Sequence, residues 1–202
     1  FAQGNIGHGF AMLTVPLFFL GGSMLSGLLI ERRELQGRVP QYGLAVGIEF
    51  ACLAGVALGG WLGYFGPWGE PLALRHDYAL LALLCTAMGI QNAVVTSVSG
   101  SVVRTTHLTG ITTDLGVGIV RVLFPERRPE FIDRERRFNR LRCGILVFFV
   151  LGSACGAVAC SEFGYLGFLL PATIALYAIV AALKVWQKPG FRQSLEVLIS
   201  RG

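Results

Sequence analysis

Apolar residues occur in long runs along the chain, separated by short polar and charged segments. A helix that crosses the hydrocarbon core of a bilayer needs about 20 mostly apolar residues. Three runs have this length, and a fourth is too long for one helix and is interrupted at residues 161–164. The runs are Phe10–Ile30, Gly43–Phe65, Tyr78–Val98 and Cys143–Leu183. The pattern predicts an all-α fold, a polytopic transmembrane helix bundle with five spans, in a single membrane domain of residues 1–202.

The amino-acid composition supports this fold and limits the kinds of binding partner that we expect. Charged residues make up 14% of the chain, against about 25% in soluble domains, and the mean hydropathy is +0.62. The net charge of +5 comes from basic residues between the apolar runs, where Lys and Arg orient helices. We therefore expect the lipid bilayer as the main partner and no binding of nucleic acid.

The loops predict the direction of each span, because cytoplasmic loops carry an excess of Lys and Arg. Residues 31–41 and 125–142 and the basic tail from Lys184 are rich in these residues and should face the cytoplasm. Residues 66–77 contain Arg75 as their one Lys or Arg, and several aromatic residues lie beside them. These are Trp61, Tyr64, Phe65 and Trp68. Aromatic residues of this kind gather at membrane interfaces, so residues 66–77 should be external.

The segment between the third and fourth spans has an unusual constraint. The third span ends on the cytoplasmic side near Val98, and the arginine-rich segment that starts at Pro125 lies on the same side. Residues 99–124 must therefore enter and leave by one face. A polar, glycine-containing stretch there precedes a short apolar helix at Ile111–Phe124, which predicts a re-entrant segment buried in protein. An interfacial amphipathic helix is the open alternative, because about 14 residues is also its expected length.

Two spans resemble each other in opposite directions. Residues 18–23, with the sequence FFLGGS, match residues 148–153, FFVLGS, at Phe, Phe, Gly and Ser. Similar segments of opposite direction indicate an inverted repeat, with half-repeats at 1–77 and 78–202. The first half is incomplete, so this interpretation expects a sixth helix before Phe1. Gly4 and Asn5 lie where the first polar turn is expected.

Small residues recur at intervals of four along the second span. They are Gly43, Gly47, Ala51, Gly55, Gly59 and Gly63, and Gly152 with Gly156 forms a weaker copy in the fourth span. Such a face lets helices approach closely in lipid. We expect a close helix contact there, with a neighbour from this chain or from another.

Polar residues within the apolar spans are the candidates for a solute pathway. Glu49 lies inside the second span, where an ionisable group is costly and normally has a partner or a watery cavity; a shallow position near the interface is the alternative. Gln91 and Asn92 can hydrogen-bond a neighbouring helix or a solute.

The polar turn of the re-entrant segment supplies the remaining candidates. Thr105, Thr106 and Thr109, with Gly110, precede a helix whose positive N-terminal end can bind an anion. Arg104 would assist that role, whereas Asp114 would oppose it and could pair with Arg104 or carry a proton. His107 could relay the proton. A purely structural cap remains the alternative.

No motif for enzymatic chemistry occurs in the sequence. There is no Ser-His-Asp order, HExxH, P-loop or pair of catalytic carboxylates, so we do not expect an enzyme. The five cysteines form no CxxC pair, and the three histidines have no ligand at metal-binding spacing. We therefore expect no metal and no cofactor.

Two linked elements carry a family resemblance. They are Met88-Gly89-Ile90-Gln91-Asn92-Ala93 and Arg104-Thr105-Thr106-His107-Leu108-Thr109-Gly110. The chain resembles the YoaK-like family of bacterial inner-membrane proteins, a domain of unknown function, which has a G-x-Q-N-A element, a T-T-x-x-T-G element and an earlier T-G-N element. The chain departs from the last with Gln3-Gly4-Asn5. The resemblance implies a multi-pass protein of the bacterial inner membrane and supplies no activity.

Two functional hypotheses follow. The first is a small-solute transporter or channel-like protein whose pathway follows the polar turns of an inverted repeat. The second is an accessory subunit that packs, through its small-residue face, in a homo-oligomer or a larger membrane complex.

Overall fold

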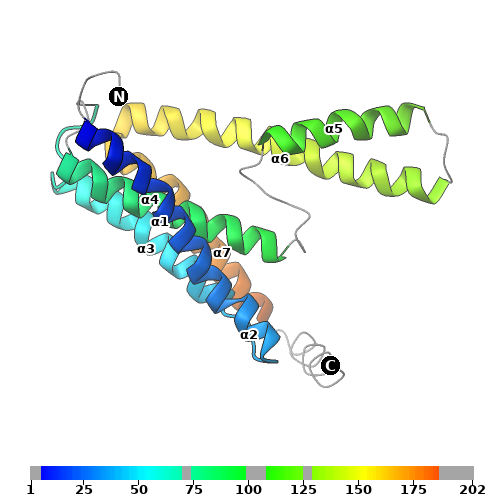
Figure 1. Ribbon diagram of the computed structural model, residues 1–202, viewed down its shortest axis with the longest axis horizontal. Helices are drawn as coiled ribbons and strands as arrows, with labels where there is room; N and C mark the ends of the chain where they lie inside the picture. The colour runs from blue at the N-terminus through cyan, green and yellow to red at the C-terminus, as the bar shows by residue number, and fades with distance from the viewer. Residues whose placement is uncertain (1–5, 70–73, 99–107, 125–128, 187–202) are drawn as a thin grey trace.

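The computed structural model of the chain describes residues 6–69, 74–98, 108–124 and 129–186, and it is helical almost throughout (Figure 1). Its elements are α1 (Ile6–Leu29), α2 (Glu31–Leu35), α3 (Tyr42–Trp61), α4 (Leu74–Val98), α5 (Leu108–Leu123), α6 (Pro129–Phe163), the 3-10 helix η1 (Gly164–Phe168) and α7 (Leu169–Trp186). No strand occurs among the described residues. The predicted all-α class is confirmed.

Four stretches of helix are long and apolar enough to cross a membrane. They are Thr14–Leu35, Tyr42–Trp61, Tyr78–Val98 and Pro129–Ala181. The fourth contains both α6 and most of α7, which η1 joins. The chain is therefore a polytopic helical membrane protein, as the apolar runs predict, and its last two predicted spans lie within one continuous apolar stretch.

Several helix boundaries differ from the sequence prediction: α1, α4 and α5 begin three or four residues earlier than expected. The helix predicted to reach Phe65 ends at Trp61, because Gly63 has a φ of 76° and the amide of Tyr64 donates to the carbonyl of Gly59 at 2.8 Å. A glycine in the left-handed conformation ends a helix, because it lets the following amides donate hydrogen bonds to the last carbonyls of the helix. The arginine-rich segment before Cys143 is helical and continuous with the fourth span, so α6 is 35 residues long.

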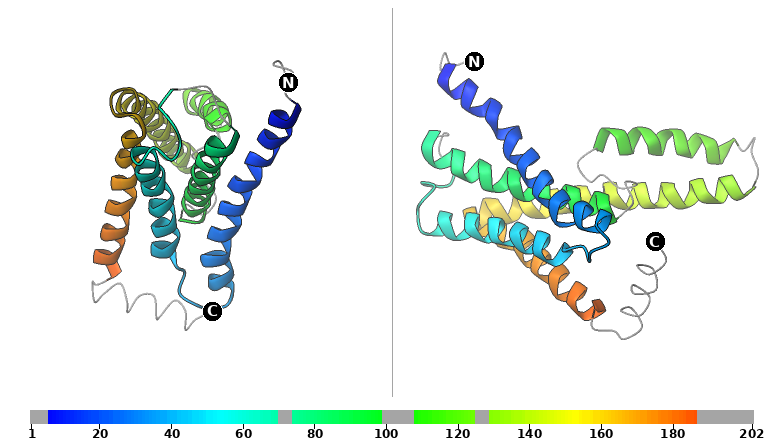
Figure 2. Two further views of the ribbon diagram at one scale, coloured as in Figure 1. Left: turned by 90° about the vertical axis from the view of Figure 1, so that its left-hand side faces the viewer. Right: turned by 60° about the horizontal axis from the view of Figure 1, so that its bottom comes forward.

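Four helices, α1, α3, α4 and α7, lie side by side in a bundle (Figures 1 and 2). Helix α4 packs between α1 and α3, and α3 packs against α7. One buried cluster contains Ile30, Ala45 and Ile90, and a second contains Leu53, Ala87 and Ala172. Large apolar side chains on the outside of the bundle remain exposed, as expected for a surface that faces lipid.

Helices α1 and α4 approach each other closely at two glycines. A Cβ added at Gly22 would overlap the backbone carbonyl of Thr86, and one added at Gly89 would overlap the carbonyl of Phe19. The hydroxyl of Ser23 donates to the carbonyl of Gly89 at 3.1 Å. Glycine therefore brings two backbones into contact here, in the manner of small-residue interfaces in lipid.

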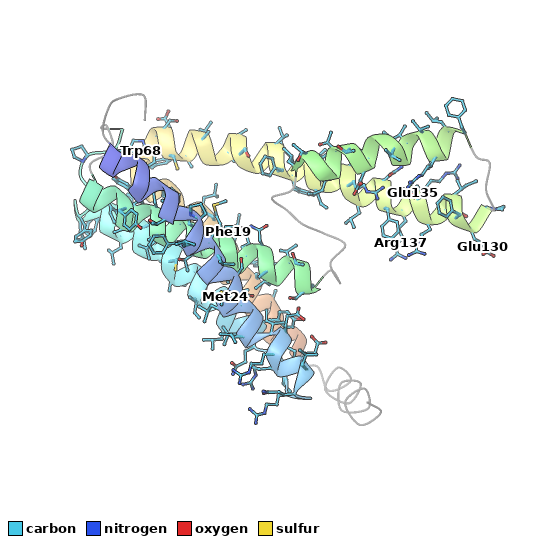
Figure 3. All side chains as sticks on the ribbon, in the orientation of Figure 1. Phe19, Met24, Trp68, Glu130, Glu135 and Arg137 are labelled. Atoms are coloured by element: carbon cyan, nitrogen blue, oxygen red, sulfur yellow. The ribbon has the colours of Figure 1, made fainter. Side chains whose placement is uncertain are left out.

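Different groups close the two ends of the bundle. At one end Trp68, labelled in Figure 3, packs on Tyr165 with ring centroids 4.9 Å apart, and the Tyr165 hydroxyl donates to the carbonyl of Phe65 at 3.3 Å. At the end that carries α2, the Ser97 hydroxyl donates to the Glu31 carboxylate at 2.5 Å. Aromatic and basic loops thus lie at opposite ends, as the alternating spans predict.

Helices α5 and α6 form a hairpin that extends away from the bundle (Figures 1 and 2). Helix α5 packs on α6, and α6 returns to the bundle through η1. The predicted polar turn at residues 99–107 lies outside the described residues. The re-entrant segment therefore stays a prediction, and its short helix, α5, lies against α6 in the structure.

Candidate functional site

A cavity of about 490 Å³ lies between α3, α4 and α7. Its lining is apolar except for two side chains, Glu49 from α3 and Gln91 from α4. Glu49 comes seven residues after Tyr42, the start of α3, and Gln91 comes seven residues before Val98, the end of α4. At 1.5 Å per residue both lie about 10 Å from the same end of the bundle. The two polar groups therefore share one depth, inside the apolar part of the helices.

A second cavity, of about 720 Å³, adjoins the first between α4, α6 and α7. Met88, Gln91 and Ile174 line both cavities. On its far side α6 contributes Arg140 and Phe148. The two cavities form one region around Gln91, which we call the Gln91 cleft, with a carboxylate on one side and a guanidinium on the other.

The adjacent amides Gln91 and Asn92 have different surroundings. The Asn92 side chain is buried and donates to the carbonyl of Met88, one turn back on its own helix, at 2.8 Å. Gln91 is exposed to the cleft. Of the pair predicted from the sequence, Gln91 is the one whose side chain lines the two cavities.

Glu49 is 7% exposed, and no hydrogen bond or ion pair reaches its carboxylate within the part of the chain that the structure describes. Helices α3, α4 and α7 surround it with aliphatic side chains, among them Leu53 and Ala175. This burial is by protein, so the alternative of a shallow position near the membrane interface stays open. A buried polar group normally has a partner, so this carboxylate is a strong functional candidate.

Of the other predicted pathway residues, those that the structure describes do not line the cleft. Thr109, Gly110 and Asp114 are exposed on α5, and the Thr109 carbonyl accepts a hydrogen bond from the Thr113 hydroxyl at 2.9 Å. Gly4, Asn5, Arg104, Thr105, Thr106 and His107 lie outside the described residues. The sequence prediction did not include Arg140, because this residue was grouped with the arginines that orient the protein. The sequence feature that could have indicated it is its position one helical turn before Gly144, at the start of the apolar run.

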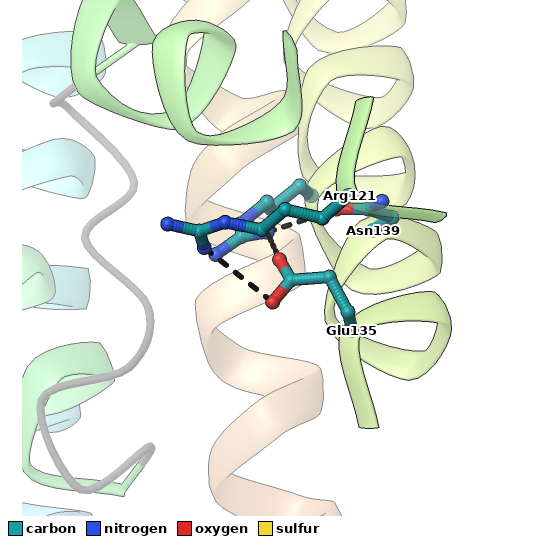
Figure 4. Close-up of polar contacts among 4 residues, drawn as sticks. Arg121, Glu135 and Asn139 are labelled. Carbon is teal, nitrogen blue, oxygen red and sulfur yellow. Dashed lines mark hydrogen bonds and ion pairs between the residues drawn. The ribbon is translucent and has the colours of Figure 1, made fainter. Parts of the chain in front are cut away.

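A second polar cluster joins α5 to α6 (Figure 4). Glu135 is 6% exposed; it accepts from Arg142 at 2.9 Å and lies 3.6 Å from Arg121. Arg142 also donates to the amide oxygen of Asn139 at 2.9 Å, and Gly118 gives the cluster room, since a Cβ there would overlap it. The charges are compensated within the cluster, which indicates a structural role.

No metal site emerges from the described part of the chain. No three His, Cys, Asp or Glu side chains gather there in a group able to hold a metal ion. The five cysteines are free, and Cys155 is exposed on α6 although its apolar run suggests a core residue.

The small-residue face of α3 has an open side. Nothing within 4 Å faces a Cβ added at Gly43, Gly47 or Gly55, and Ala51 is exposed. Gly59 instead meets the ring of Phe65, and Gly63 lies beyond the helix. Gly152 and Gly156 on α6 are open in the same way. The predicted close contact therefore has no neighbour among the described helices of this chain.

Comparison with known proteins identifies a family over most of the chain. A family model described as a protein of unknown function, DUF1275, matches residues 1–182. This confirms the resemblance carried by the Gly89-Ile90-Gln91-Asn92-Ala93 element. No curated protein and no solved structure matches the chain.

Proposed function

Since the chain belongs to the DUF1275 family, whose activity is unknown, we propose that it binds a small amphipathic solute and moves it across the membrane, as a transporter or channel-like protein. The observation that supports this most is the position of Gln91, which lines two adjoining cavities at membrane depth. Small-molecule sites are concave and mostly apolar, with a few convergent polar groups that fix orientation. The Gln91 cleft has this composition.

The residues that line the cleft indicate which class of solute it would bind. Most lining residues are aliphatic or aromatic, so a sugar or an inorganic ion would lose its hydration shell without replacement. A solute with an apolar body and one or two polar groups would bury its body against Leu84 and Phe168 and hydrogen-bond Gln91.

Uptake into liposomes tests this function. Purified protein is reconstituted and offered a panel of radiolabelled amphipathic solutes, and the wild type is compared with Gln91→Leu. The control is Thr173→Leu, the same kind of change at an exposed position of α7 outside both cavities. We expect one solute whose uptake depends on the protein, falls at least tenfold in Gln91→Leu and persists in Thr173→Leu. Equal uptake by Gln91→Leu and the wild type would contradict the proposal.

We place the protein in the bacterial inner membrane, as the family implies, with α2 and the start of α6 on the cytoplasmic side. The arginines of both segments support this direction. A membrane-impermeant thiol reagent applied from outside should label a cysteine at Glu70 and leave one at Arg136 unlabelled, in a background without native cysteines. Equal labelling at both positions would overturn the orientation.

The open small-residue face favours a second function, that of a subunit in a homo-oligomer or larger membrane complex. Gly43, Gly47 and Gly55 expose bare backbone with nothing within 4 Å. In lipid, such a face associates through close packing with another helix.

The subunit function is tested by measuring association and folding separately. Gly47→Leu and Gly55→Leu should reduce cross-linking to a second copy or co-purification of a partner. They should leave the unfolding of the monomer unchanged, because no described residue lies within 4 Å of a Cβ added at either position. Gly27→Leu, at another open glycine on α1, is the control. A protein that stays monomeric and unaccompanied in its native membrane would eliminate this candidate.

A further inference from the structure

The charge of the solute can be inferred from Glu49, on the premise that the proposed transport function is correct. Its carboxylate is 7% exposed, lines the cavity between α3, α4 and α7, and receives no hydrogen bond or ion pair in the described part of the chain. Removing a carboxylate from water is costly unless another group compensates it. Among the described side chains of the helices around it, none supplies such a group.

The described basic side chains nearest in the sequence or in the cleft have other positions. Arg38 is exposed in the loop after α2. Arg33, on α2, donates through Nε to the carbonyl of Val39, 3.0 Å away, in the loop. Arg140 lines the neighbouring cavity on α6 and is absent from the lining of the Glu49 cavity. Since no described basic side chain pairs with Glu49, the occupant of the cavity is the partner that we consider for its charge.

The rest of the lining excludes a bare metal ion and favours an organic cation. Alkali and alkaline-earth ions need about six oxygen ligands, and this cavity offers only the side chains of Glu49 and Gln91. Its other lining residues are apolar, including Leu53, Leu84 and Phe168, and its volume of about 490 Å³ lies in the range of small-molecule sites. Apolar walls and one carboxylate suit a ligand with an apolar body and one positive charge.

We propose that the cavity between α3, α4 and α7 is a binding site for an apolar organic cation, whose charge pairs with Glu49 and whose body lies against the aliphatic wall. Gln91 connects this site to the neighbouring cavity toward α6. Glu49 then selects the charge of the solute, and the wall around it selects the size.

Two ions of the same shape and opposite charge provide the test. Purified protein in detergent is titrated with radiolabelled tetraphenylphosphonium and, separately, with tetraphenylborate, with protein-free micelles as the blank. We expect saturable binding of the phosphonium ion and at least tenfold weaker binding of the borate. Glu49→Gln should weaken phosphonium binding at least tenfold, whereas Glu162→Gln, at an exposed carboxylate outside both cavities, should leave it unchanged.

A second variant keeps the carboxylate and fills the cavity. Leu84→Trp should also abolish phosphonium binding, because the indole occupies the space of the ligand; its helical circular dichroism and elution volume should match the wild type. Unchanged phosphonium binding in Glu49→Gln, or equal binding of both ions by the wild type, would overturn the inference.

The outcomes separate this inference from the function on which it rests. If a neutral or anionic solute is taken up in a Gln91-dependent way and phosphonium does not bind, transport stands and the cationic site is wrong. If phosphonium binds through Glu49 and no solute crosses the membrane, the site stands and transport is wrong.

Discussion

The bundle and the α5–α6 hairpin hold their helices together in opposite ways. In the bundle α1 meets α4 backbone to backbone at Gly22 and Gly89, and apolar clusters lie between the helices. In the hairpin the buried contact is ionic, around Glu135, while apolar residues such as Val120 and Leu123 point outward. Moving an apolar side chain from lipid into the protein gains little free energy. Helices in a membrane therefore associate through close packing and polar contacts. Close packing with a few single hydrogen bonds predominates in the bundle, and a cluster of charged groups predominates in the hairpin.

The largest effect is expected where backbones touch. Gly22→Leu should destabilise the protein by about 3 kcal/mol or more, because the carbonyl of Thr86 is backbone and cannot move aside. Gly21→Leu, one residue away with nothing within 4 Å, is the matched control and should change little. Unfolding by SDS in mixed micelles measures both. Equal stability of the two variants would show that α1 and α4 do not pack in this way.

Breaking the ionic contact of the hairpin should have a smaller, local effect. Glu135→Ala removes the partner of Arg142 and should destabilise the α5–α6 contact by about 2 kcal/mol, since Arg121 is half exposed and can turn to solvent. Faster hydrogen exchange of the α5 amides, with no change in α1 and α4, is the expected observation. Asp133→Ala, which removes an exposed ion pair with Arg136, serves as the control and should leave exchange unchanged.

A single hydrogen bond between bundle helices should contribute less again. Ser23→Ala removes the bond to the Gly89 carbonyl and should lower the free energy of unfolding by about 0.6 kcal/mol, the average for such bonds between membrane helices. The same SDS titration applies. A loss several times larger would mean that the hydroxyl, and not the glycines, fixes the α1–α4 contact.

The smallest effect is expected one turn further along α1. Ser26 is 1% exposed, and its hydroxyl has no hydrogen-bond partner among the residues that the structure describes. Ser26→Ala should therefore leave stability unchanged or raise it slightly, because no bond is lost and a buried polar group is removed. A clear destabilisation in the titration would reveal a partner for this hydroxyl.

The helical class could be predicted from the sequence, because a membrane-spanning helix is recognised by the length of its apolar run. It also indicated Glu49 and Gln91, because polar groups in such runs are few. It could not predict which glycines make contact between helices. Gly43, Gly47 and Gly55 of the regular series are open, whereas Gly22 and Gly89, in no series, lie where α1 and α4 meet. Four-residue spacing defines a helix face and leaves open whether a neighbour faces it. The sequence could not predict that Arg140 lines the cleft, because this depends on where α6 returns to the bundle in the folded protein.

The length of α6 has a mechanical consequence. At 35 residues it is about 52 Å long, and it is one continuous helix from the α5 contact to η1, where Gly164 has a φ of 56°. A straight rod anchored at one end amplifies rotation: a tilt of about 10° at η1 displaces the far end by about 9 Å on that length. A ligand that draws the middle of α6 toward α4 would therefore move the arginine-bearing N-terminal end of α6 by more than the length of a side chain. The position of that end of α6 would depend on whether the cleft is occupied.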